Sequence, residues 1–116
     1  MEMDLEINVR SEKNVPVIEL NGEVDAYTSA RFRETMIELI ENGAASLIIS
    51  MDRVDYIDSS GLGALVGGLK RASERQGRIV IVCSNPQVKK VFEITGLERV
   101  FSLYALEEDA VEGVSG

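Results

Sequence analysis

One segment of the chain, residues 58–63 with the sequence DSSGLG, combines residue types and spacing that could do chemistry. It lies between a strand-like run and an amphipathic helix, which places its serines at the helix start. We predict Ser60 as the N-cap, its hydroxyl accepting from the Gly63 amide, which leaves the hydroxyl of Ser59 free. A phosphate on Ser59 would lie near unpaired amides and the positive end of the helix dipole, so the fold would tolerate it. Ser59 is therefore the predicted phosphate acceptor; the alternative from spacing alone is that residues 58–60 only cap the helix.

Most simple enzyme classes are excluded because the chain has no histidine. A Ser-His-Asp or Cys-His arrangement needs a histidine base. Neither serine lies in the Gly-x-Ser-x-Gly motif of serine hydrolases. Gly61 and Gly63 lack the third glycine of a dinucleotide fingerprint, since Val66 stands there, and no Gly-Lys-Ser/Thr follows. We predict no catalytic residue, no cofactor and no enzyme activity.

Three aspartates could cluster where two loops meet, namely Asp25, Asp55 and Asp58. Carboxylates are suitable ligands for a divalent cation, but these three lack the ligand spacing of a calcium-binding loop. We therefore prefer the interpretation of solvated acidic loops and predict no metal site.

The predicted helix over residues 60–76 carries four glycines in its first half, Gly61, Gly63, Gly67 and Gly68. Each costs about 0.8–1 kcal/mol relative to alanine in a helix interior, so local stability does not explain them. Either the glycines let the helix lie close on the sheet, or they let the backbone of another molecule approach its exposed side. Because Gly63 and Gly67 fall on a strip beside the buried stripe, both explanations stay open.

The size and charge of the chain limit its organisation and its partners. Its 116 residues, 45% of them hydrophobic, suit one domain with a buried core, and its net charge of -8 repels nucleic-acid phosphates and anionic membranes. A protein partner with a basic face fits better. No run approaches the ~18 apolar residues of a membrane span, and the acidic start lacks the positive charge of a secretory signal. Cys83 is the only cysteine, which excludes an internal disulfide, so we expect a cytoplasmic protein.

Hydrophobic periodicity predicts elements in the order β-β-α-β-α-β-α-β-α, joined by right-handed parallel crossovers after an initial hairpin. The predicted elements are hairpin strands over residues 5–9 and 15–20, further strands over 47–49, 79–82 and 100–104, and helices between 28 and 43, over 60–76, between 85 and 96 and over 105–112. This is an α/β fold with a mixed, mostly parallel sheet and about four helices. We expect one domain over residues 1–116, with its core at about 4–104, followed by the short acidic helix and a frayed tail from 113.

Local signals mark two of the helix starts. Thr28 is the predicted N-cap of the first helix, and Tyr27 and Phe32 occupy the positions of a hydrophobic staple. The third helix begins with Asn85 as N-cap and Pro86 at the first helical position.

The segment 58–63 resembles the phosphorylation motif of bacterial anti-sigma factor antagonists, which belong to the STAS domain family. Residues 22–25 (GEVD) resemble the turn after the second strand of that family, and residues 85–97 resemble its third helix. Together these matches cover most of residues 4–104. In the family the first serine after the aspartate is phosphorylated, which implies Ser59 here. The resemblance also implies that Asp25 helps to bind the basic surface of a partner kinase; a plain turn aspartate is the alternative.

The resemblance implies partner switching. The unmodified protein would bind an anti-sigma factor, itself a serine kinase that binds ATP, and so release the sigma factor for transcription. Phosphorylation of Ser59 would separate the complex, and a metal-dependent serine phosphatase would restore the hydroxyl. The partner-binding residues expected on this basis are Asp25, Asp58, Ser59, Ser60, Gly61, Leu62, Gly63 and Gly67. The alternative within the family is a scaffold or the cytoplasmic subunit of a lipid-transport complex, in which Ser59 is never modified.

Overall fold

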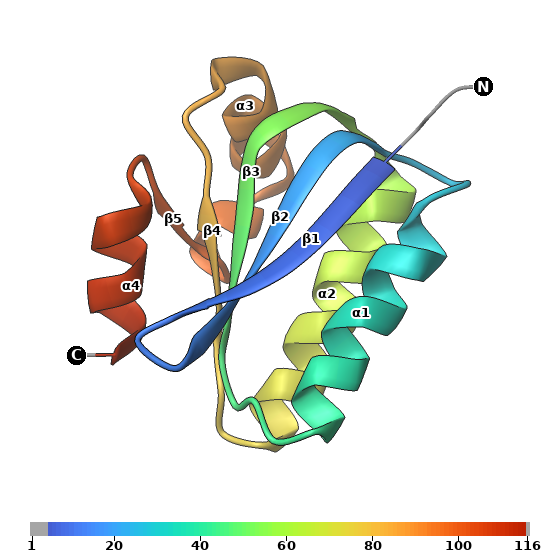
Figure 1. Cartoon of the computed structure of the whole chain (residues 1–116). Helices are drawn as coiled ribbons and strands as arrows, with labels where there is room; N and C mark the ends of the chain where they lie inside the picture. The colour runs from blue at the N-terminus through green and yellow to red at the C-terminus, as the bar shows by residue number, and fades with distance from the viewer. Residues whose placement is uncertain (1–4, 116) are drawn as a thin grey trace.

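The computed structural model describes residues 5–115, which form one α/β domain with the predicted order of elements (Figure 1). The strands are β1 (Leu5–Glu12), β2 (Val15–Val24), β3 (Leu47–Ile57), β4 (Ile79–Val82) and β5 (Ser102–Tyr104). The helices are α1 (Ser29–Glu41), α2 (Ser59–Glu74), α3 (Pro86–Thr95) and α4 (Glu107–Ser115), with a short 3-10 helix at Leu97–Arg99. The sheet runs β1-β2-β3-β4-β5, antiparallel between β1 and β2 and parallel elsewhere. The predicted mixed, mostly parallel sheet is confirmed.

The hairpin between β1 and β2 closes through a two-residue turn. Glu12 pairs with Val15, so Lys13 and Asn14 alone lie between the strands, and their φ angles are 51° and 67°. Positive φ at both turn positions is the geometry whose twist matches that of the flanking strands. The predicted hairpin is confirmed.

β3 is much longer than predicted. Residues 47–49 are buried, as expected for a strand covered on both faces, but the strand continues to Ile57 with buried and exposed positions mixed. The side chains of Asp52, Arg53 and Asp55 in this second half are exposed, and their charges concealed the strand in the sequence. The extension brings the end of β3 alongside the end of β2.

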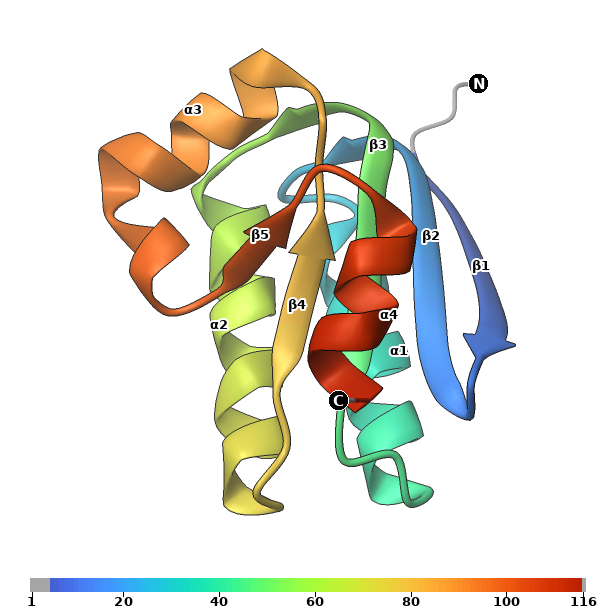
Figure 2. The same ribbon diagram turned by 90° about the vertical axis from the view of Figure 1, so that its left-hand side faces the viewer.

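Helices cover both faces of the sheet, with α1 and α2 on one face and α4 on the other (Figures 1 and 2). The larger core cluster joins the strands to α1, α2 and α3, and Phe32, Met36, Leu65 and Phe92 are fully buried in it. A smaller cluster lies under α4, and its buried residues are Val17, Ile48, Val80, Val82, Ala110 and Val111. Because both faces are covered, β4 is buried over its whole length.

α4 is part of the packed domain. The guanidinium of Arg10 donates to the Glu107 carboxylate at 2.5 Å, and this hydrogen bond raises the pKa of Arg10. Near the other end of the helix, Arg78 donates to the Gly113 carbonyl at 3.2 Å. Residues 113–115, expected as a frayed tail, continue α4, and Val114 packs against the cluster beneath the helix. The last residue and the first four lie outside the described residues.

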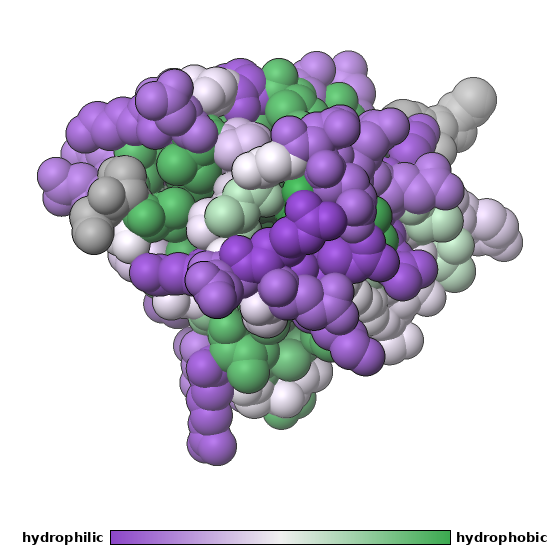
Figure 3. Space-filling view, turned by 90° about the horizontal axis from the view of Figure 1, so that it is seen from below, coloured by the Kyte–Doolittle hydropathy of each residue, from purple (hydrophilic) through white to green (hydrophobic). Residues whose placement is uncertain are grey.

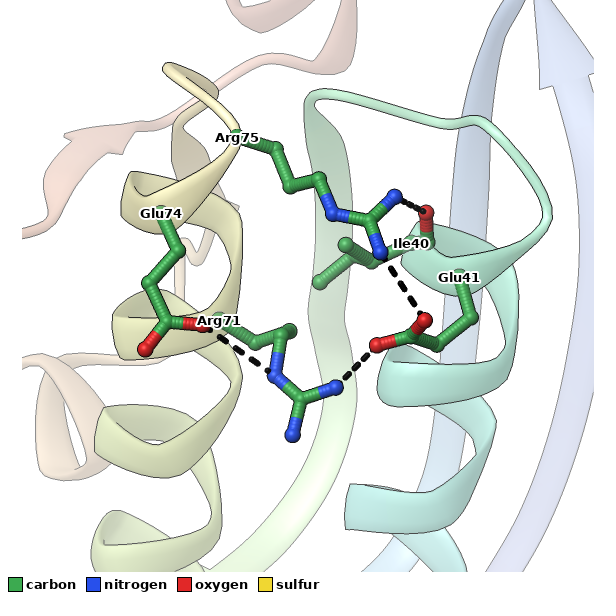
Figure 4. A network of polar contacts seen from close by, with 5 residues as sticks. All are labelled: Ile40, Glu41, Arg71, Glu74 and Arg75. Atoms are coloured by element: carbon green, nitrogen blue, oxygen red, sulfur yellow. Dashed lines mark hydrogen bonds and ion pairs between the residues drawn. The ribbon is translucent and has the colours of Figure 1, made fainter.

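Ion pairs join the C-terminal ends of α1 and α2 (Figure 4). The Glu41 carboxylate accepts from Arg71 and, at 2.9 Å, from Arg75, which also donates to the Ile40 carbonyl at 3.3 Å. Arg71 lies 3.4 Å from Glu74 on its own helix. These side chains are partly exposed, so each pair contributes about 0–1 kcal/mol, and their main effect is to hold the two helices side by side.

The end of the domain seen from below presents a broad band of polar side chains between separate apolar patches (Figure 3). This end holds the β1-β2 turn and the C-terminal ends of α1 and α2, and it lies opposite the edge that carries the predicted site (Figure 1). None of the helices within residues 5–115 is long and apolar enough to cross a membrane.

Candidate functional site

The predicted site lies at the carboxyl edge of the sheet, where the parallel strands end and α1 and α2 begin (Figure 1). Val24 pairs with Ile57 at the ends of β2 and β3, and the Asp58 amide donates to the Val24 carbonyl at 3.2 Å. Asp25 and Asp58 therefore follow paired residues on neighbouring strands. The two turns that they begin lie next to each other.

Asp58 is the N-cap of α2. Its Oδ1 accepts from the amides of Ser60 at 2.9 Å and Gly61 at 3.2 Å, and its carbonyl accepts from the Leu62 amide at 2.9 Å. The prediction of Ser60 as N-cap is wrong, because aspartate caps as well as serine and Asp58 lies closer to the end of the strand. The helix therefore begins earlier than predicted, at Ser59.

The two serines of the motif differ in exposure. Ser59 is exposed, and its side chain makes no hydrogen bond to any residue from 5 to 115. Ser60 is half-buried and lines a hollow between α1 and α2. The expectation that Ser59 has the free hydroxyl agrees with this geometry, although the carboxylate of Asp58, rather than a serine, binds the helix amides. The phosphorylation of Ser59 stays a prediction.

Asp25 forms its turn in the same manner. Its Oδ1 accepts from the amides of Tyr27 at 2.9 Å and Thr28 at 3.1 Å. The Thr28 hydroxyl does not cap α1, because it donates to the Glu23 carbonyl and accepts from the Asp25 amide, both at 2.9 Å. Thr28 is 2% exposed. Asp25 therefore has the structural role in a turn that the sequence analysis gave as the alternative to partner binding. Its contact with a partner stays a prediction.

Tyr27 stands out from this turn, with 93% of its surface exposed. The predicted staple with Phe32 is wrong, since Phe32 is fully buried and the turn leaves Tyr27 in solvent. The sequence analysis missed Tyr27 as a candidate contact residue, because the same position also suits a staple. Tyrosine is enriched among residues that carry binding energy at protein interfaces.

Two glycines of α2 serve close packing. A Cβ on Gly61 would lie 2.7 Å from Cγ1 of Val24, and one on Gly68 would lie 2.6 Å from Sδ of Met36. Gly61 is itself buried, and Leu62 is 9% exposed within the core. Both residues lie inside the domain and position the start of α2, so their burial does not favour the expected direct contact with a partner, which stays a prediction.

The other two glycines of α2 have no such packing role. A Cβ on Gly63 would meet no atom within 4 Å. A Cβ on Gly67 would lie 2.9 Å from Nε of Arg33, and the Arg33 side chain is flexible and exposed. Packing therefore explains Gly61 and Gly68, and the surface role of Gly63 and Gly67 stays open.

The edge around the motif is acidic. Glu23 and Asp55 are exposed, and Asp25 and Asp58 are half-buried. Nowhere in residues 5–115 do three histidine, cysteine, aspartate or glutamate side chains group so that they could hold a metal ion. The arrangement offers a negatively charged surface, which favours a partner with a basic face.

The chain is similar to known proteins over nearly its whole length. The family model of the STAS domain matches residues 6–110. The anti-sigma-B factor antagonist of Bacillus subtilis (strain 168) is 31% identical over 110 residues, which cover 95% of this chain and 100% of that protein. The anti-sigma factor antagonist SpoIIAA in its unphosphorylated form has a TM-score of 0.82 at 27% identity, over 96% of this chain and 97% of its own. The Bacillus SpoIIAA in its phosphorylated form has a TM-score of 0.72 at 25% identity, over 94% and 99% of the two chains. This chain belongs to the STAS domain family.

Proposed function

We propose that this protein is an anti-sigma factor antagonist controlled by phosphorylation of Ser59. Its unmodified form binds an anti-sigma factor that is also a serine kinase, and so frees the sigma factor for transcription. The kinase, which binds the ATP, phosphorylates Ser59 and the complex separates; a metal-dependent serine phosphatase then restores the hydroxyl. The observation that carries the proposal is the exposed Ser59 side chain at the first position of α2.

Because Asp58 caps α2, the helix has few free amides left to donate hydrogen bonds to a phosphate on Ser59. The amides of Ser60 and Gly61 already donate to the Asp58 carboxylate, and the Leu62 amide donates to its carbonyl. A phosphate would add about -1.5 to -2 charges beside that carboxylate, with the Ser59 amide left as its donor in the first turn. Modification therefore changes the charge of the surface without replacing a hydrogen bond of the fold.

The size of the effect depends on what the partner places nearby. An acidic group of the partner ~6 Å from the phosphate gives a repulsion of a few kcal/mol at an effective dielectric constant of about 20. A penalty of ~3 kcal/mol weakens binding roughly 100-fold. This is enough to dissociate a complex without any refolding.

The relatives support the proposal. The Bacillus subtilis protein is named for antagonism of an anti-sigma factor, and SpoIIAA is described in an unphosphorylated and a phosphorylated form. Both forms share the fold of this chain, which supports a modification that leaves the domain intact. The proposal is of a regulatory protein rather than an enzyme, located in the cytoplasm, where transcription takes place.

The test is phosphorylation by the anti-sigma factor kinases of the protein's own organism. The purified protein is incubated with ATP and each kinase, and its mass and peptide map are measured. We expect one added phosphate on the peptide that contains Ser59, in the unaltered protein and in Ser60→Ala, and none in Ser59→Ala. Phosphate on Ser60, or none with any of the kinases, would contradict the proposal, and the second result favours the scaffold role.

A further inference from the structure

A groove runs between α1 and α2 away from Ser59. Its first part has a volume of about 360 Å³ and is lined by small residues of both helices, Ser29, Ala30, Ser60, Gly63, Ala64 and Gly67. A second hollow of about 240 Å³ shares Gly67 and Arg33 with the first and continues past Lys70. The groove therefore begins next to Ser59, and its far part is lined by three cations, Arg33, Lys70 and Arg71, and by one carboxylate, that of Glu74.

Gly63, in the floor of the groove, has no packing explanation inside the domain, whereas Gly67 lies under the Arg33 side chain. A Cβ on Gly63 would have no contact within 4 Å. A Cβ on Gly67 would have the Arg33 side chain as its nearest neighbour, and that side chain would have to move. Each glycine nevertheless weakens α2 relative to alanine. The two glycines lie four residues apart on one row of the helix surface, which is open at Gly63 and bordered by the Arg33 side chain at Gly67. A ridge of side chains on another helix can enter this row at Gly63.

Two of the cations at the far end of the groove are unpaired. Arg33 and Lys70 are exposed and form no ion pair within the described residues, whereas Arg71 and Arg75 are engaged by Glu41. Glu74 also lines this hollow and pairs with Arg71, so Arg33 and Lys70 leave it locally positive in a protein with a net charge of -8. A negatively charged ligand complements this site.

We propose that this groove receives an acidic helix of the same anti-sigma factor, so that the partner contacts two surfaces of opposite charge. The inference rests on the proposed function and extends it. The backbone of α2 at Gly63 contacts the partner helix closely, and carboxylates of that helix pair with Lys70 and with Arg33, which lies beside Gly67. Binding of a helix in a groove between helices is a common mode of recognition.

The groove also supplies a reason for the effect of phosphorylation. Ser60 lines its upper end and directly follows Ser59 in α2. A phosphate on Ser59 therefore stands where an acidic helix enters, and the two negative charges repel each other. The acidic group of the partner that the switch requires is thus the same helix that pairs with Arg33.

The test is a set of matched variants titrated by calorimetry with the kinase found to phosphorylate Ser59. Arg33→Ala removes a cation from the groove, and Arg53→Ala removes an exposed cation from a hollow on the β1-β2-β3 surface, lined also by Glu6 and Glu107. We expect Arg33→Ala and Lys70→Ala each to weaken binding up to about 5-fold, and Arg53→Ala to leave it unchanged.

A second pair of variants tests the glycine floor. Gly63→Ala should raise the melting temperature and still weaken binding ~10-fold, because the added methyl group blocks the approach of the partner. The control Ser73→Ala changes an exposed position of the same helix, and its affinity should equal that of the unaltered protein.

The outcomes separate the two proposals. Phosphorylation and tight binding of the unaltered protein, with equal affinities for Arg33→Ala, Arg53→Ala and Gly63→Ala, would overturn the groove and leave the switch standing. A dimer of this protein that Gly63→Ala dissociates would assign the groove to a second copy and also overturn it. Absence of both phosphorylation and binding in the unaltered protein would overturn both.

Discussion

The turns at Asp25 and Asp58 have the same pattern of aspartate hydrogen bonds and differ in the hydroxyls beside it. In both turns Oδ1 accepts from the amides two and three residues further along. In the first turn the hydroxyl belongs to Thr28, which is 2% exposed and bonded to the Glu23 carbonyl. In the second turn the hydroxyls belong to Ser59, which is exposed, and to Ser60, which is half-buried.

The difference shows that an aspartate cap at the sheet edge does not by itself make a modification site. The Thr28 hydroxyl holds the backbone of its turn, so a phosphate there would remove two hydrogen bonds and bury charge. The cap of the second turn is complete without Ser59. The side chain that is dispensable for the fold is thus the one available for regulation.

The largest contrast in stability is expected within the second turn, between Gly61 and Gly63. Gly61→Ala places a methyl group 2.8 Å from the Val24 carbonyl oxygen, so it should lower the free energy of unfolding by about 1–3 kcal/mol. Gly63→Ala meets no atom within 4 Å and should raise it by about 0.8–1 kcal/mol. Urea denaturation of both variants measures the free energy of unfolding. Changes of the same sign in the two variants would contradict the conclusion that Gly61 is closely packed and that Gly63 faces open space.

The next contrast compares the two hydroxyls directly. Thr28→Val leaves the Glu23 carbonyl and the Asp25 amide without their partner, so the free energy of unfolding should fall by about 1–3 kcal/mol. Ser59→Ala removes no hydrogen bond and should change it by less than about 0.5 kcal/mol. Equal losses in thermal or urea unfolding would show that Ser59 also supports its turn.

A smaller effect, on binding, is expected when the charge of Asp25 is removed and the geometry of its turn is kept. Asparagine retains an Oδ1 that can accept from the Tyr27 and Thr28 amides, so Asp25→Asn should unfold like the unaltered protein. Because the loss is that of one partly exposed ion pair, binding to a basic partner surface should weaken up to about 5-fold. An unchanged affinity and unchanged salt dependence would limit Asp25 to its role in the turn.

The smallest effect concerns the third turn of this edge, at Asn85. Burial raises the pKa of the neighbouring Cys83 thiol from 9.0, and the thiol donates to the Asn85 carbonyl at 3.6 Å. The folded state therefore keeps the thiol proton more tightly than the unfolded state. This contribution to stability is complete well below pH 9.0 and is lost as the pH rises through 9.0 toward the raised pKa of the folded state. This slope should be absent in Cys83→Ala, and an identical slope in both proteins would contradict the assignment.

The sequence predicted the fold well because its periodicities are local and strong. The alternating hairpin, the apolar strand at 79–82 and the Asn85-Pro86 helix start each have a short-range signal, and each is present in the structure. The end of β3 could not be predicted in this way, because pairing with β2 continues through the charged residues 52–55. Pairing of that kind depends on the neighbouring strand rather than on the segment itself.

The sequence predicted where the site lies, at the start of α2, but not which residue caps the helix or which glycines are packed. Asp58 and Ser60 are both good capping residues, and only the backbone geometry decides between them. The four glycines of α2 are alike in sequence; which ones pack is decided by Val24 and Met36, residues from other elements. The groove with Arg33 was missed altogether, because it exists only once α1 lies beside α2.

The most direct test of the central claim compares the unmodified and the Ser59-phosphorylated protein in one experiment. Affinity for the anti-sigma factor is measured by calorimetry, and the melting temperature of each form alone is measured alongside. The account predicts that phosphorylation weakens binding roughly 100-fold while the two melting temperatures agree. Equal affinities, or a loss of affinity that accompanies unfolding of the phosphorylated domain, would contradict it.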